Sequence, residues 1–152
     1  MSAAQLTRSV HQVVRRKLDV HKWLESEKAG MDLGEQAIRD WVQHYWDRFL
    51  RDCWLEHILG KVLWTELGKE NFGICQQQFE EDPLAEEIVE LFKKGGNEGE
   101  NLGIIMLAQD LGWPMEHVFD ILHTIDINSY RMVRQVQERV IHEYALSRPG
   151  LN

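Results

Sequence analysis

The chain has 152 residues, of which 43% are hydrophobic, and a formal net charge of −8 at pH 7. This length and composition predict a single domain, residues 1–152, and the excess of acidic side chains argues against binding to phosphate backbones. No run reaches the roughly 18 consecutive apolar residues of a membrane span, and the first residues lack the order of a secretion signal, so we expect no membrane association and a cytoplasmic location.

The first predicted helix extends from Leu6 to about Gly30. Its apolar residues recur every three or four positions, which is the period of an amphipathic helix. They are Leu6, Val10, Val13, Val14, Leu18 and Leu24. After this helix, Asp32 stands three residues before Glu35, a spacing typical of a capping box at the start of a second helix.

The second predicted helix contains the stretch DWVQHYWDRFLRDCWLEHILGKVLW, which holds four of the six tryptophans. At 100° per residue, Trp41 and Trp46 fall on the apolar half of this helix and are predicted to lie in the core. Trp54 leaves that half where charged residues enter it, which predicts a bend or a new helix near Asp52–Glu56. Trp64 lies beyond the point where the period is lost, and the pattern assigns it to neither core nor surface.

The acidic residues are concentrated in the range 61–100, which holds ten acidic and four basic residues, a net charge of −6. This range contains the clearest local signal, DPLAEEIVELFKKGG, where Asp82 is a predicted N-cap, Pro83 takes the first helical position and Gly95 ends the helix. The polar connection GGNEGE follows, and it separates possible sub-units at 1–94 and 101–152.

Two short helices, Leu102–Leu111 and Pro114–Ile125, are predicted on either side of GWP, and an amphipathic helix is predicted for Asn128–Leu146. The two short helices resemble a helix-turn-helix pair, which makes a DNA-binding regulator one alternative function. However, the sequence has no lysine or arginine between Lys94 and Arg131, and a DNA-binding surface needs cations for phosphates and base edges. The charge pattern therefore disfavours a nucleic-acid partner.

Four residues could bind a metal or a cofactor, because each pair is spaced to lie on one face of a helix: His21 with Glu25, and Cys53 with His57. The alternative function is therefore a metal- or tetrapyrrole-binding protein, with haem or a transition metal as the cofactor. Di-metal helical bundles repeat Glu-x-x-His, which this chain lacks, and the pattern favours core packing for these side chains, without metal or cofactor.

The sequence gives little indication of catalysis. It contains no G-x-S-x-G, P-loop or dinucleotide-binding glycine motif. The two cysteines, Cys53 and Cys75, show no C-x-x-C spacing and are expected to be free thiols, and no histidine can be paired with Cys75 from sequence. The interpretation leans towards a protein that is not an enzyme.

Three tryptophans are candidates for contacts with a protein partner. Trp23 lies opposite the apolar face of its helix, Trp54 leaves the apolar half of its own helix, and Trp113 stands at a corner before a proline. Exposed tryptophans are uncommon on monomers and are enriched at the centres of protein interfaces. These residues therefore indicate self-association or a protein partner.

The stretch HKWLESEKAGMDLGEQAIRDW, His21 to Trp41, resembles a segment of bacterial proteins of uncharacterised function that carry H-x-W followed by S-E-x-A-G-x-D-x-G. The matching residues are His21, Trp23, Ser26, Glu27, Ala29, Gly30, Asp32 and Gly34. The resemblance covers about twenty residues and implies no activity. In this segment we expect the glycines to form a corner between helices, with His21 and Glu27 bracing it.

The sequence thus predicts an all-α protein: a single compact domain of five or six helices in an orthogonal or irregular bundle, with a helix-turn-helix-like pair towards the C-terminus. We expect a non-enzymatic, self-associating protein-interaction or regulatory module.

Overall fold

A computed structural model of the chain describes residues 5–96, 99–129 and 142. The amphipathic helix predicted for Asn128–Leu146 lies almost entirely outside these residues. Within them the protein is all-α, as predicted, apart from one pair of two-residue strands. None of the described helices is both long enough and apolar enough to span a bilayer.

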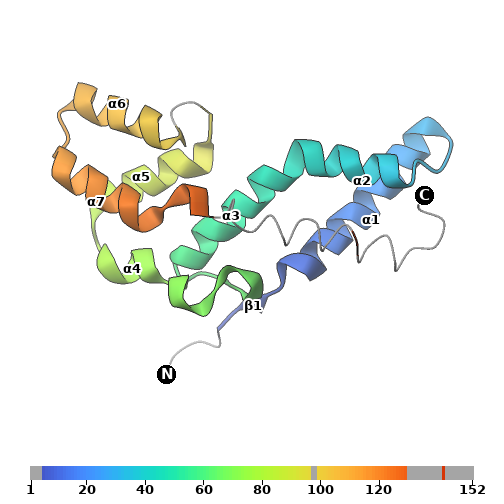
Figure 1. The fold of residues 1–152 in the computed structure, drawn as a ribbon, viewed down its shortest axis with the longest axis horizontal. Coiled ribbons are helices and arrows are strands. Elements are labelled where there is room, and N and C mark those ends of the chain that lie inside the picture. Colours follow the sequence, from blue (N-terminus) through green and yellow to red (C-terminus); the bar gives the residue numbers. More distant parts are fainter. Residues whose placement is uncertain (1–4, 97–98, 130–141, 143–152) are drawn as a thin grey trace.

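The elements follow one another in this order: β1 (Thr7–Arg8), α1 (Val10–Ala29), α2 (Glu35–Trp41), the π-helical segment η1 (Val42–Trp46), α3 (Asp47–Ile58), β2 (Leu63–Trp64), the 3-10 turns η2 (Thr65–Leu67) and η3 (Lys69–Asn71), α4 (Ile74–Gln78), α5 (Pro83–Lys94), α6 (Asn101–Leu111) and α7 (Met115–Ile125). Helices α2, η1 and α3 form one uninterrupted rod. Helix α1 packs beside the first half of this rod, and α4, α5, α6 and α7 gather around its far end (Figure 1).

Helix α1 begins at Val10 and not at Leu6 as predicted. The residues before it are extended, because β1 pairs in parallel with β2 and the backbone N–H of Leu63 donates a 2.8 Å hydrogen bond to the carbonyl of Leu6. Glu66, just after β2, accepts hydrogen bonds from the Ser9 hydroxyl at 2.6 Å and from the backbone N–H of Val10 at 2.7 Å. A carboxylate that is distant in sequence therefore caps the positive end of α1.

The capping box predicted for Asp32 and Glu35 is wrong. Residue Gly34, with a φ of 54°, is the N-cap of α2, and no side chain caps it. Asp32 instead accepts a hydrogen bond from the backbone N–H of Gly34 at 3.0 Å, and Glu35 pairs with Arg39 at 2.7 Å. The corner is closed by a local Asx turn, a motif that competes with helix capping for the same side chain.

The bend predicted near Asp52–Glu56 is also wrong, because the rod continues through this range without a break. The irregularity lies earlier, in η1, where the hydrogen bonds follow the wider π-helical pattern. Trp41 and Trp46 are five residues apart, yet both are buried and their rings meet edge to face with centroids 6.2 Å apart. The prediction that both lie in the core is confirmed, and the π-helical turn explains how they share one face.

The helix that begins after Asp82 is confirmed as α5. Asp82 accepts hydrogen bonds from the backbone N–H groups of Leu84 and Ala85 at 3.0 and 3.2 Å, and Gly95 ends the helix with a φ of 74°. The second carboxylate oxygen of Asp82 lies 2.6 Å from Nε2 of His117, which joins the start of α5 to α7. The N-cap therefore has a tertiary role as well as a local one.

Residue Arg51 of α3 is buried and holds the start of α6 in place. Its guanidinium donates a 2.6 Å hydrogen bond to Glu100 and another to the carbonyl of Gly99, and it lies over the ring of Phe92 on α5, 5.6 Å from the centroid. Helix α5 and the end of the polar connection GGNEGE, just before α6, thus both pack on the rod.

Candidate functional site

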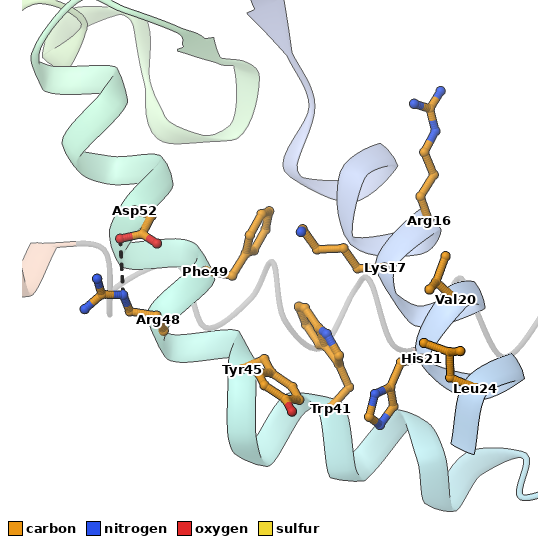
Figure 2. A pocket seen from close by; sticks show the side chains of 10 residues that line it. All are labelled: Arg16, Lys17, Val20, His21, Leu24, Trp41, Tyr45, Arg48, Phe49 and Asp52. Atoms are coloured by element: carbon orange, nitrogen blue, oxygen red, sulfur yellow. Dashed lines mark ion pairs between the residues drawn. The ribbon is translucent and has the colours of Figure 1, made fainter. Parts of the chain in front are cut away.

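An open groove separates α1 from the rod formed by α2, η1 and α3. It has a volume of about 600 Å³. Ten side chains line it, five from α1 and five from the rod (Figure 2). They are Arg16, Lys17, Val20, His21, Leu24, Trp41, Tyr45, Arg48, Phe49 and Asp52.

The groove has an aromatic floor and a polar rim. Trp41 is 5% exposed and packs against the rings of Tyr45 and Phe49, at centroid distances of 6.3 and 6.1 Å. Lys17 extends across the groove from α1 and places its ammonium 5.4 Å from the centroid of Phe49. At one end Nε of Arg48 lies 3.4 Å from Asp52. Such a surface suits a ligand with one apolar and one polar face.

Asp40 connects the two walls at the other end of the groove. Its carboxylate lies 2.9 Å from Nε2 of His21 on α1 and 3.1 Å from Nδ1 of His44 on the rod. The ring of His21 also meets Tyr45 edge to face at 5.9 Å. His21 therefore pairs with Asp40 and not with Glu27, so the bracing contact predicted between His21 and Glu27 is wrong. Asp40 lies on the adjacent helix, which sequence spacing alone does not indicate.

The groove combines a histidine–carboxylate pair with charged and apolar side chains. The pair of Asp40 and His21 resembles an oriented general base, but none of the ten lining residues is a serine, threonine or cysteine that such a base would activate. What the groove presents instead is a continuous apolar floor between cationic and anionic side chains.

The exposed side of α1 next to the groove is also apolar. The exposed fraction is 58% for Val20, 63% for Trp23 and 45% for Leu24, while Tyr45 on the facing rod is 52% exposed. Trp23 thus occupies the surface position that the sequence predicts, although its contact with a partner remains a prediction.

The second tryptophan proposed for a partner, Trp54, is instead buried inside the chain. It is 5% exposed, and its indole N–H donates a 2.9 Å hydrogen bond to the carbonyl of Ile125 at the end of α7. The π-helical turn before Trp54 is wider than an α-helical turn, and a wheel drawn at a constant 100° does not follow it, so the wheel gives Trp54 the wrong angle. The surface assignment of Trp54 is therefore wrong, and Trp64, left unassigned by the sequence, is 2% exposed.

Trp113, the third candidate, is partly buried and packs against the core where α6 turns into α7. Helices α6 and α7 carry a second set of exposed apolar residues, all at least half exposed. They are Leu102, Met106, Leu111 and Phe119.

The four residues proposed for a cofactor do not gather at one site. His21 pairs with Asp40, and Glu25 pairs with Lys28 at 3.3 Å. On α3, both ring nitrogens of His57 are engaged: Nε2 lies 2.6 Å from the carbonyl of Gly68, and Nδ1 accepts a 3.0 Å hydrogen bond from the backbone N–H of Trp64. An axial or metal ligand needs a free ring nitrogen, so this arrangement gives no support to His57 as a ligand.

The cysteines are free, as expected, and both are buried. Burial, followed by the charges of Glu56 and Asp52, raises the pKa of Cys53 far above its usual value, and burial raises the pKa of Cys75 to about 11. Both thiols are therefore protonated near neutral pH, whereas a nucleophile or metal ligand needs the thiolate. Among the described residues, no group of three or more His, Cys, Asp or Glu side chains is placed to hold a metal ion.

The predicted helix-turn-helix-like pair corresponds to α6 and α7, joined at Gly112 with a φ of 71°. The exposed side of α7, where a DNA-binding protein would carry its recognition residues, presents Glu116 and Asp120. These carboxylates would repel phosphates, so the geometry adds no support for DNA binding to what the sequence indicates.

A scan of protein-family models found no match to this chain, and searches of curated proteins and of solved structures found none either. The resemblance of the segment His21 to Trp41 to bacterial proteins therefore remains a prediction.

Sequence reasoning missed the rod side of the groove, above all Tyr45 and Phe49. A wheel with a constant period gives both residues to the apolar half of the second helix and thus to the core. The signal that could have revealed the site is the spacing of the buried positions, because Trp41, Trp46 and Leu50 follow one another at intervals of five and four. An interval of five within a helix indicates a π-helical turn, and such turns are frequent at functional sites.

Proposed function

We propose that the protein is a non-enzymatic interaction module that binds an amphipathic helix of a protein partner along α1 and the groove beside it. The observation that carries this proposal is the set of exposed apolar side chains on α1, namely Val20, Trp23 and Leu24. Two of them, Val20 and Leu24, line the groove together with the exposed Tyr45 of the rod. Monomeric proteins rarely leave such side chains together in water, and apolar clusters with a polar rim are typical of binding surfaces.

The form of the groove supports a helical ligand. A groove between helices with an apolar floor is a usual receptor for an amphipathic helix, whose anchors recur every three or four residues. Arg16, Lys17 and Arg48 on the rim favour carboxylates on the ligand, and Asp52 accepts a cation at one end.

The experiment is site-specific crosslinking in cells of the native host. A photo-crosslinking amino acid in place of Tyr45 should give a covalent adduct with a protein, because this position faces the groove. The matched control places the same amino acid at Glu87, an exposed residue on the solvent side of α5. If Tyr45 gives no more protein adduct than Glu87, the proposed function is wrong.

A further inference from the structure

Four exposed residues of α1 form a stripe along the helix. Arg16, Val20, Trp23 and Glu27 follow one another at intervals of four, three and four, which places them within about 60° of the helix circumference. We refer to these four residues as the α1 stripe. Arg16 and Val20 belong to it and also line the groove.

The two charges at the ends of the α1 stripe are unused within the described chain. Lys22 pairs with Asp32 at 3.6 Å and Lys28 with Glu25 at 3.3 Å, but neither Arg16 nor Glu27 takes part in an ion pair there. A cation and an anion on one exposed apolar stripe thus remain available to another molecule.

The α1 stripe is complementary to itself. Its intervals of four, three and four read the same in both directions, while the charges at its two ends are opposite. When two such helices lie antiparallel, Arg16 of each copy meets Glu27 of the other, and Val20 of each meets Trp23 of the other. Intervals of three and four also form the seam of closely packed helix pairs.

We propose that the helix bound at this surface is α1 of a second copy of this chain, paired antiparallel through the α1 stripe about a two-fold axis. This inference rests on the proposed function and names its partner. A two-fold axis makes both halves of such an interface identical, so one Arg16 to Glu27 contact implies the other.

The charges select this arrangement over others. A parallel pair in the same register would place Arg16 against Arg16 and Glu27 against Glu27, and like charges in contact are costly. The protein as a whole carries a net charge of −8, which opposes self-association at long range, so specific local ion pairs are needed to offset it.

The size of the surface indicates a dimer of moderate affinity. A stable interface buries about 800 Å² on each partner, and one tryptophan contributes up to about 250 Å². The α1 stripe alone falls short of this area, so Leu24 and Tyr45, which border it on the groove side, have to contribute. We expect a dissociation constant nearer to the micromolar than to the nanomolar range.

Charge exchange tests the inference. By sedimentation analysis over a range of protein concentrations, the wild-type chain should reach twice its mass of 17.9 kDa. Arg16→Glu alone and Glu27→Arg alone should each weaken dimerisation at least about tenfold, because each creates two like-charge contacts. The double variant should dimerise again, and a mixture of the two single variants should form a heterodimer. Lys69→Glu and Glu87→Arg, which make the same charge changes at exposed positions elsewhere, should have no effect.

Several outcomes would overturn the inference: a wild-type chain that stays monomeric, single variants that dimerise like wild type, or a double variant that does not recover. The crosslinking experiment then separates the two proposals. An adduct at Tyr45 with another protein would leave the proposed function standing with a different helix as the ligand. The absence of any adduct would remove both.

Discussion

The indole of Trp54 is buried where α3 meets the end of α7, and its hydrogen bond satisfies the carbonyl of Ile125. Replacing Trp54 with alanine should lower the free energy of unfolding by about 3–5 kcal/mol, because a cavity remains and the carbonyl loses its partner. Trp54→Phe should retain most of the packing and cost less. Denaturant unfolding measures both variants, and a loss below about 1 kcal/mol for Trp54→Ala would contradict the structural role.

The hydrogen bonds of His57 require a neutral ring, in which Nε2–H donates to the carbonyl of Gly68 and Nδ1 accepts from the N–H of Trp64. Burial lowers the pKa of His57, although the hydrogen bond to Gly68 and the charge of Glu70 oppose this shift. The unfolded chain therefore binds a proton at a higher pH than the folded chain. Stability should fall as the pH drops below the unfolded value of about 6.5, and level off below the folded pKa.

His57→Gln, which can still donate and accept, is the variant that tests this pH dependence. Unfolding in urea at about pH 7.5 and about pH 5, on either side of the unfolded pKa, should show a smaller loss of stability in His57→Gln than in wild type. The two proteins differ only at position 57, so the difference between them isolates His57. If the unfolding free energy falls equally with pH in both proteins, the protonation of His57 is not linked to folding.

At the scale of single elements, the start of α1 depends on Glu66. Burial alone would raise the pKa of Glu66, but the hydrogen bonds from Ser9, Val10 and Thr65 outweigh it and lower the pKa overall. Glu66→Gln removes the negative charge and one acceptor, and should cost about 1 kcal/mol near neutral pH, like the loss of an N-cap.

The difference between wild type and Glu66→Gln should itself depend on pH. A carboxyl with a lowered folded pKa contributes stability above its unfolded value of about 4.3, and this contribution disappears as the pH falls through the folded pKa. Unfolding measured at pH 7 and under acid conditions should therefore give two stability curves that converge in acid. If wild type and Glu66→Gln differ by the same unfolding free energy at both pH values, the charge of Glu66 does not stabilise the start of α1.

The joint between α3 and α6 rests on Arg51. Replacing it with methionine keeps most of the apolar stem over Phe92 but leaves the carbonyl of Gly99 and Glu100 without their donor. We expect a loss of about 1–3 kcal/mol in unfolding free energy, and faster amide exchange in α6. Arg51→Lys should recover only part of the loss, because a lysine cannot reach two acceptors in a fixed fork. If amide exchange in Arg51→Met becomes faster to the same extent throughout the chain, Arg51 does not stabilise α6 locally.

The elements differ in how far the sequence predicts them, and the reason is physical. Helix α5 was predicted at both ends because its signals, Asp82, Pro83 and Gly95, all act within one turn of the helix. The β1–β2 pair and the cap from Glu66 join residues more than fifty positions apart, and nothing local indicates them. The candidate site is predicted only in part. The exposed position of Trp23 follows from the regular period of α1, whereas the groove depends on the irregular turn η1 in the rod.

At the scale of the whole molecule, self-association links stability to concentration. If two copies pair through the α1 stripe, the melting temperature should rise with protein concentration, because dimerisation stabilises only the folded chain. Trp23→Ala should abolish this dependence while leaving the melting temperature of the dilute protein almost unchanged, since Trp23 is 63% exposed. Scanning calorimetry over a concentration series measures both effects. A concentration-dependent melting temperature in Trp23→Ala would place the contact elsewhere.

The π-helical turn of η1 holds one residue more than an α-helix would place between Trp41 and Trp46. Deleting one residue such as Gln43, which is exposed, would let η1 become an ordinary α-helix. Trp41 and Trp46 would then stand four positions apart, about 40° around the helix, so Trp46 and Leu50 would keep the core face. The rod therefore accommodates the loss of one residue at this turn, and genuine relatives of this chain should tolerate a one-residue gap between Trp41 and Trp46 but not elsewhere in the rod.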